Sequence, residues 1–402
     1  MAGIAPRGAK QVVIRAGGSV LAVHHLRGRK FDLRVPLPRH DVVVRVTATD
    51  ARGRRSRASV AHVFGLPLSA RPRGTLPRLD PRLARRIVPL VRSFPGASAV
   101  YVRDLTTGAG AAWNARAQFP AGSTLKLAIA VEALRSLHGK PPSGSYADRL
   151  FHSALIYSDN GAANDLEVLF AGSTSAGSAR VNALMRSLGL VDSEMYGGYE
   201  RGPSVAPIPG RVDEQPYYGY GKHTSAYDLA QLFSLVHLAA EGEGRLAKHN
   251  PGFTSADARY LLYLLVHSAD HGKLDRFLGG QNATVAHKAG WITAARHDAG
   301  LVYFRGGVFA VAVMTYGSGV GTASDVLAGR VAHRALTQLS ARSARHGQRR
   351  RSQAGTPVEA RSKELGHEDQ DQPALLISLR TASSAGRRSP RPESTGPDGR
   401  VT

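Results

Sequence analysis

The stretch FPAGSTLKLAIAVEAL, residues 119–134, places Ser123 and Lys126 three positions apart at the start of a long apolar run. On an α-helix, residues three apart lie on the same face, so the two side chains would be neighbours. Unpaired backbone N–H groups at a helix N-terminus stabilise negative charge on a serine oxygen. A desolvated lysine has a lowered pKa and can accept the serine proton. The pair is therefore either a nucleophile with its base or a helix cap followed by a surface lysine.

A second motif, Ser158-Asp159-Asn160, lies in the stretch YSDNGAAND, residues 157–165, between two segments of helical periodicity. It offers a hydroxyl that can pass on a proton, a carboxylate that can fix a turn, and a carboxamide that can bind a substrate amide. Ser, Asp and Asn are also common where helices end, because their side chains bond to nearby backbone groups. Taken alone, this motif is explained by capping.

A third motif lies in VAHKAGWITAARHDAG, residues 285–300, where Lys288 interrupts an apolar strand. The following Ala289 and Gly290 leave a narrow backbone surface that a ligand can approach. The alternative is a lysine that protects an edge strand from pairing with another chain.

The elements expected around these motifs follow a simple order. A helix after Pro81 precedes two strands, a block of helices, three strands and a closing helix. This order predicts an α/β (α+β) fold in which one antiparallel sheet is packed by helices and joined to an all-helical lobe. Valine-rich runs within residues 1–66 predict a small β-sandwich-like module, followed by a Pro- and Gly-rich linker over 67–80. We place the main domain at 81–342 and a disordered basic tail at 343–402, because that tail is rich in Arg, Ser and Pro.

The three motifs in this order resemble those of class A β-lactamases and penicillin-binding proteins. The segments LFHSALIYSDNGAANDLEVLF, HTSAYDLAQLF and HKAGWITAARHDAGLVYF are similar to this serine hydrolase family as well. The resemblance covers roughly residues 80–342 and implies the same β-lactamase/transpeptidase-like architecture. It also implies that Ser123 is the acylated nucleophile, that Lys126 is its base, and that Ser158 links the proton network.

The resemblance further implies a set of substrate-binding groups. Asn160 would bind the substrate amide. Lys288, with Gly290 behind it, would supply positive charge for a substrate carboxylate and for the Ser158 hydroxyl. The oxyanion hole would be formed by the backbone N–H groups of Ser123 and Trp291.

The sequence departs from the family pattern at three places. The family usually has Thr or Ser at the position of Ala289, so we expect Thr293 to take over part of the carboxylate binding. The interval from Ser123 to Ser158 is short for the family. The Glu-x-x-x-Asn pair that drives deacylation in the lactamases is not found between residues 191 and 222, because no Asn stands four residues after Glu194, Glu200 or Glu214. We therefore expect an acyl-enzyme that turns over slowly rather than an efficient β-lactamase.

The charge distribution bears on partners. Residues 1–90 carry 19 Lys and Arg against 4 Asp and Glu, whereas the middle of the chain is nearly neutral. An anionic envelope polymer is a possible partner of the basic N-terminal module, and nucleic acid is disfavoured because no recognition motif is present. No apolar run is long enough for a membrane span.

The remaining expectations concern substrate, cofactors and location. We expect a small-molecule or peptidoglycan-like substrate and no cofactor or metal. The histidines form no HExxH, and His152, His267 and His271 are interpreted as core or surface residues. The resemblance implies an extracytoplasmic, cell-envelope location, although the first residues show no signal peptide. The alternative function is a catalytically degenerate, β-lactamase-like binding protein.

Overall fold

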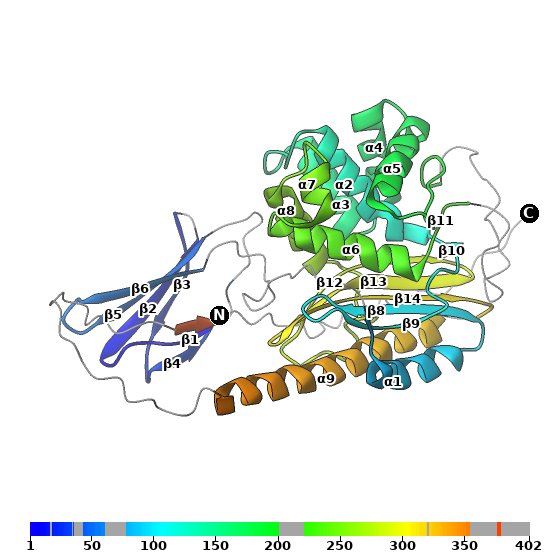
Figure 1. Ribbon diagram of the computed structural model, residues 1–402. Helices are drawn as coiled ribbons and strands as arrows, with labels where there is room; N and C mark the ends of the chain where they lie inside the picture. Colours follow the sequence, from blue (N-terminus) through cyan, green and yellow to red (C-terminus); the bar gives the residue numbers. More distant parts are fainter. Residues whose placement is uncertain are drawn as a thin grey trace, which may run out of the picture.

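The computed structural model describes residues 1–16, 18–33, 35, 43–60, 78–200, 221–319, 321–353 and 376–378. Between residues 78 and 353, helices cover both faces of one mainly antiparallel sheet, and most of the helices on one face form a separate lobe (Figure 1). The predicted α/β class, the antiparallel sheet and the helical lobe are therefore confirmed.

The central sheet has six strands in the order β12-β13-β14-β8-β9-β7. All neighbours pair antiparallel except β7 and β9, which are parallel. The strands are β7 (Arg78–Leu79), β8 (Ala97–Asp104), β9 (Ala109–Trp113), β12 (Thr284–Ile292), β13 (Ala295–Phe304) and β14 (Gly307–Tyr316). The short strand β7 was not predicted. The strand that carries Lys288 is the edge strand β12.

One face of the sheet is covered by the two helices that bracket the domain, α1 (Pro81–Arg92) and α9 (Gly321–Gln353) (Figure 1). The start of α1 is set locally, because the Asp80 carboxylate accepts hydrogen bonds from the Arg82 and Leu83 amides, and Pro81 needs no partner there. The apolar stripe of α1, formed by Leu83, Ile87 and Val91, is buried in the core on this face.

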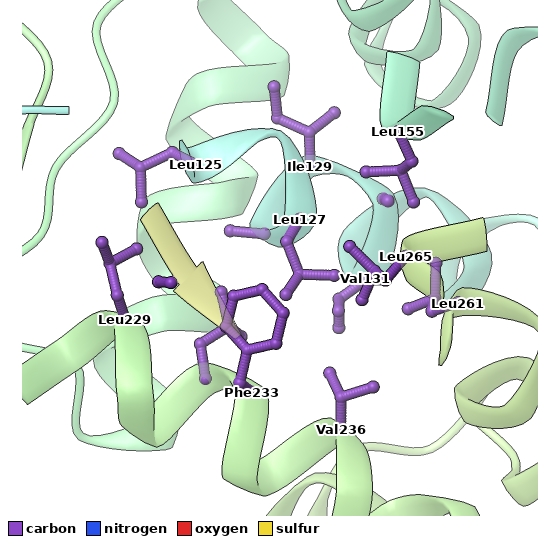
Figure 2. Packing of buried hydrophobic residues seen from close by; sticks show 14 of the residues in the cluster. Leu125, Leu127, Ile129, Val131, Leu155, Leu229, Phe233, Val236, Leu261 and Leu265 are labelled. Carbon is purple, nitrogen blue, oxygen red and sulfur yellow. The ribbon is translucent and has the colours of Figure 1, made fainter. Parts of the chain in front are cut away.

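The opposite face carries the helical lobe. Its helices are α2 (Lys126–Ser136), α3 (Tyr146–Ile156), α4 (Asn160–Ala171), α5 (Thr174–Leu188), α6 (Ala226–Ala240), α7 (Gly244–His249) and α8 (Ser255–Val266). Helix α2 lies in the middle of the lobe, and residues 126–134 are all buried. Figure 2 shows Leu127 and Val131 of α2 close to Phe233 and Val236 of α6. The motif that contains Ser123 and Lys126 thus leads into a helix that is surrounded by protein.

The N-terminal residues form two small antiparallel sheets with an apolar core of their own. One has the order β3-β2-β5-β6. The other has the order β15-β1-β4, in which β15 (Leu376–Ser378) comes from the C-terminal part of the chain. The strands are β1 (Ala2–Ile4), β2 (Ala9–Ala16), β3 (Ser19–His25), β4 (Lys30–Asp32), β5 (Val44–Asp50) and β6 (Arg55–Val60). Among the described residues, no helix is long and apolar enough to cross a membrane.

The C-terminal part differs from the expectation of a disordered tail from residue 343. Helix α9 continues to Gln353, and residues 376–378 form β15 (Leu376–Ser378), which pairs with β1. That strand belongs to the apolar run PALLISL, whose composition suits a strand better than a solvated tail. Most of the predicted linker at 67–80 and the rest of the tail lie outside the described residues.

Candidate active site

Ser123 lies in a single 3-10 turn, η1 (Gly122–Leu125), directly before α2. This turn packs tightly on strand β12: a Cβ on Gly122 would lie 2.7 Å from the Trp291 amide nitrogen, and one on Gly290 would lie 2.7 Å from the Ser123 amide nitrogen. Gly122 also has a φ of +52°, which disfavours a side chain. Glycine at both positions therefore allows the backbone of the turn and of the strand to approach each other.

Lys126 is the first residue of α2, and only 1% of its surface is exposed. Its Nζ donates to the Ser158 carbonyl oxygen and, over 2.5 Å, to Asn160 Oδ1. Burial and then the charge of Lys288 lower the pKa of Lys126 to about 7. A surface lysine following a helix cap is therefore not what the structure contains.

Ser158 occupies the junction between α3 and α4 in a left-handed conformation, with φ of +61°. Such a conformation is unfavourable for a residue with a side chain and persists only where its surroundings hold it. Asp159 caps α4 through a 2.6 Å hydrogen bond from the Ala162 amide, which is the structural role expected for it. The Ser158 carbonyl accepts from Lys126, and its hydroxyl accepts from Lys288 over 2.7 Å.

Lys288 is fully buried although it lies on an edge strand. Besides Ser158 Oγ, its Nζ contacts the Ala289 carbonyl oxygen at 2.9 Å. Burial lowers the pKa of Lys288 to about 8, and the nearby Asp270 and Asp298 oppose this shift. The interpretation of Lys288 as an exposed edge-protecting residue is wrong. The fold thus brings both lysines to Ser158: Lys126 contacts its carbonyl oxygen, and Lys288 contacts its hydroxyl.

The sequence comparison decides the family. The family model described as "Beta-lactamase enzyme family" matches residues 82–141 and 137–339. The chain belongs to this beta-lactamase family. The match covers the whole helical lobe and all of the central sheet except β7, and membership supports serine-hydrolase-type activity in general. None of the curated proteins matches the sequence.

Solved structures agree with the beta-lactamase family fold. "Structure of PBP-A" superposes with a TM-score of 0.51 at 20% identity, covering 66% of this chain and 98% of PBP-A. The beta-lactamase from Streptosporangium roseum has a TM-score of 0.51 at 17% identity and covers 65% of this chain and 99% of that one. A point mutant of PBP-A, solved as an acyl-enzyme complex with penicillin G, gives 0.51 at 21% identity, covering 66% and 99%. At these identities the likeness concerns the fold.

The beta-lactamase domain does not place every predicted residue in direct contact with the others. Within the described residues, no hydrogen bond joins the half-buried Ser123 hydroxyl to Lys126 or Ser158. Thr293 is exposed in the turn after β12, and its part in carboxylate binding stays a prediction. Ala289 is buried and offers no hydroxyl.

The loop that follows α5 contributes a residue that sequence reasoning missed. The ring of Tyr199 has its centroid 4.7 Å from Lys126 Nζ and 5.1 Å from Lys222 Nζ. The side-chain amide of Asn164 in α4 makes two hydrogen bonds to the Tyr199 backbone. It accepts from the Tyr199 N–H over 2.6 Å and donates to the Tyr199 carbonyl oxygen over 2.8 Å. The only signal in the sequence is an aromatic residue in the glycine-rich stretch YGGYE, which many structural loops share.

The same loop contains the glutamates considered for deacylation. The backbone of Glu194 pairs with His223, which in turn pairs with Pro120 just before the Ser123 turn. Glu200 is exposed, and its charge acts to raise the pKa of Lys126 against the effect of burial. Glu214 lies outside the described residues.

Proposed function

We propose that this member of the beta-lactamase family is a serine hydrolase that forms an acyl-enzyme at Ser123 with a lactam, a peptide amide or an ester. The observation that carries the proposal is the meeting of two buried lysines at Ser158, next to the turn that holds Ser123. Burying two ammonium groups is costly, and a serine hydrolase has a use for each of them. Buried, pKa-shifted groups of this kind cluster at functional sites.

In the proposed acylation, neutral Lys126 accepts the Ser123 proton while Ser123 Oγ attacks the substrate carbonyl carbon. The developing oxyanion would be stabilised by the Ser123 and Trp291 N–H groups. The C–N or C–O bond then breaks, and the leaving atom takes up a proton. Because Ser158 Oγ accepts its hydrogen bond from Lys288, Ser158 can donate its own hydrogen to that atom while the Lys288 ammonium replaces it. This leaves Lys126 protonated and Lys288 neutral until both exchange protons with solvent.

Substrate binding would use the polar groups around this centre. The Asn160 carboxamide, whose oxygen already accepts from Lys126, has its N–H₂ group available for a substrate carbonyl. The Lys288 charge suits a substrate carboxylate, although Ala289 removes a hydroxyl that would help hold it. A peptidoglycan-like peptide or a β-lactam fits these groups, and the acyl-enzyme that a PBP-A mutant forms with penicillin G supports this substrate class.

Release of the acyl group is the slow step in this proposal. Deacylation needs a base that activates water against the ester carbonyl. No Glu-x-x-x-Asn pair is present in the loop sequence to supply that base. We therefore propose a slow acyl turnover rather than an efficient β-lactamase.

A binding protein with a degenerate site is the second candidate. The observations that favour it are Ala289 and the lack, within the described part of the chain, of a hydrogen bond from the Ser123 hydroxyl to Lys126 or Ser158. In that case the domain would recognise an envelope ligand without being acylated. The anionic polymer expected for the basic N-terminal module is a proposal of the same kind.

Covalent labelling separates the two candidates. The full chain is incubated with penicillin G or a fluorophosphonate, and the intact mass is measured over time. A single adduct that Ser123→Ala abolishes, and that the matched Ser19→Ala variant in the N-terminal module retains, supports the hydrolase. An unmodified protein after prolonged incubation with both reagents would rule it out and favour the binding protein.

A further inference from the structure

A second group of chemistry-bearing side chains lies next to β12, outside the acylation site. His271 and Asp275 belong to the segment between α8 and β12, and His287 is on β12 itself, directly before Lys288. One ligand atom from each of the three residues lies within 4.8 Å of the other two. Two imidazoles and one carboxylate form a donor set that suits a divalent transition metal ion.

The buried member of this group, His287, is oriented by a carboxylate. Its Nδ1 lies 2.9 and 2.8 Å from the two oxygens of Asp298, and both residues are at most 2% exposed. Because a carboxylate accepts hydrogen bonds, Nδ1 carries the hydrogen, and Nε2 is the nitrogen left for a metal. Histidine ligands of metals are held by a carboxylate in the same way.

The carboxylate member, Asp275, is also fixed before any metal binds. Its Oδ1 accepts from the Gly272 and Lys273 amides over 2.8 and 3.0 Å, and its Oδ2 lies 3.1 Å from His271 Nδ1. The Leu274 amide of the same segment donates to Asp298 over 3.0 Å, which ties the segment to His287's partner. The ligands therefore come from two parts of the chain that are already joined.

The charges around the group favour a cation. The Asp275 carboxylate contacts His271, and the Asp298 carboxylate contacts His287. The nearby Lys273 ammonium is paired with Asp270. The third ligand, His271, has 60% of its side chain exposed, so a metal ion can reach it from solvent and the imidazole can turn to meet it.

We propose that His271, Asp275 and His287 form a Zn²⁺ site. Three protein ligands leave a fourth position to water. The two nitrogen donors favour zinc over Ca²⁺ or Mg²⁺, which prefer oxygen ligands. Because side chains alternate along a strand, the ion would lie on the opposite face of β12 from Lys288. Its binding would fasten the segment after α8 to the strand that carries the site lysine.

The test is a binding experiment on the full, tag-free chain. The protein is stripped with a chelator and titrated with Zn²⁺ by calorimetry, with metal content measured after desalting, and Co²⁺ absorption as a report on the ligands. We expect one Zn²⁺ per chain, and at least a tenfold loss of affinity in both His271→Ala and Asp275→Asn. The exposed His249→Ala of α7 is the matched control and should bind zinc like the wild type.

Three results would overturn the proposal. They are the absence of stoichiometric zinc, equal affinity of the His271→Ala variant and the wild type, and displacement of the zinc by millimolar Ca²⁺ or Mg²⁺. His271 is exposed, so its variant should fold, and a far-ultraviolet circular dichroism spectrum checks that it does. The readout is metal binding rather than hydrolysis, so its outcome is independent of the function proposed for Ser123.

Discussion

Lys126 and Lys288 are chemically identical and similarly buried, and both contact Ser158, but their surroundings differ. Lys126 donates to a carbonyl and an amide oxygen and faces the ring of Tyr199. Lys288 donates to a hydroxyl and a carbonyl, and the charges of Asp270 and Asp298 act to raise its pKa. The pKa is lowered to about 7 in the first and to about 8 in the second. Burial lowers both values; the charge of Lys288 lowers the pKa of Lys126 further, whereas Asp270 and Asp298 act against the shift at Lys288. Near neutral pH, Lys126 is therefore the lysine that more readily loses its proton.

The largest effect is expected from replacing Lys126, the proposed base. Lys126→Arg keeps a positive charge but cannot release its proton near neutral pH, so it should slow acylation by roughly 10²- to 10⁴-fold. The rate of covalent labelling by a chromogenic β-lactam measures this. Lys126→Ala should be equally slow, and a fast arginine variant would show that another group takes the serine proton.

A smaller and substrate-dependent effect is expected at the second lysine. Lys288→Ala removes the charge that would meet a substrate carboxylate, and it removes the hydrogen bond to Ser158 Oγ. We expect acylation by penicillin G to fall by roughly 10- to 100-fold, mainly through weaker binding. A neutral ester that lacks the carboxylate should lose less. Equal losses for both substrates would mean that Lys288 acts through Ser158 alone.

The pH profile should show the two lysines as separate limbs. In the proposed mechanism acylation requires neutral Lys126, so the acylation rate should rise as the pH passes about 7. In the same proposal a substrate carboxylate binds to charged Lys288, so substrate binding should weaken as the pH passes about 8. Lys288→Ala should remove the upper limb and, because the Lys288 charge lowers the pKa of Lys126, move the lower limb to higher pH. The two limbs of kcat/KM for a slowly hydrolysed chromogenic ester that carries a carboxylate report these values.

The smallest effect tests the aromatic neighbour. A ring facing an ammonium favours the charged form, so Tyr199→Leu should move the lower limb down by about half a pH unit. Tyr199→Phe is the matched control, because its ring remains and, among the described residues, the tyrosine hydroxyl has no hydrogen-bond partner. A shift of the same size in the phenylalanine variant would assign the effect to the hydroxyl instead.

The fold was largely predictable because local patterns fix most of it. Helix α1 follows from its Asp-Pro cap and its apolar stripe. The turn between β8 and β9 follows from Thr106-Thr107-Gly108, where the Asp104 carboxylate accepts hydrogen bonds from the Thr106 amide and the Thr107 hydroxyl. Shorter elements were missed, since β7 (Arg78–Leu79), β10 (Phe119–Pro120) and β11 (His223–Thr224) each have two residues and no periodicity to read. Their existence depends on partners distant in the sequence.

The sequence by itself determined the three motifs and their order along the chain. Their spacing and the elements expected around them were enough to indicate a serine hydrolase site that uses Ser123, Lys126, Ser158, Asn160 and Lys288. Only the tertiary structure decided that Lys126 and Lys288 meet at the two ends of Ser158, that Tyr199 faces Lys126, and that His271 and Asp275 lie beside His287. The physical reason is that burial and electrostatic coupling act through space. A lysine's pKa or a metal's ligand set depends on groups that the chain brings together only when its helices and strands pack.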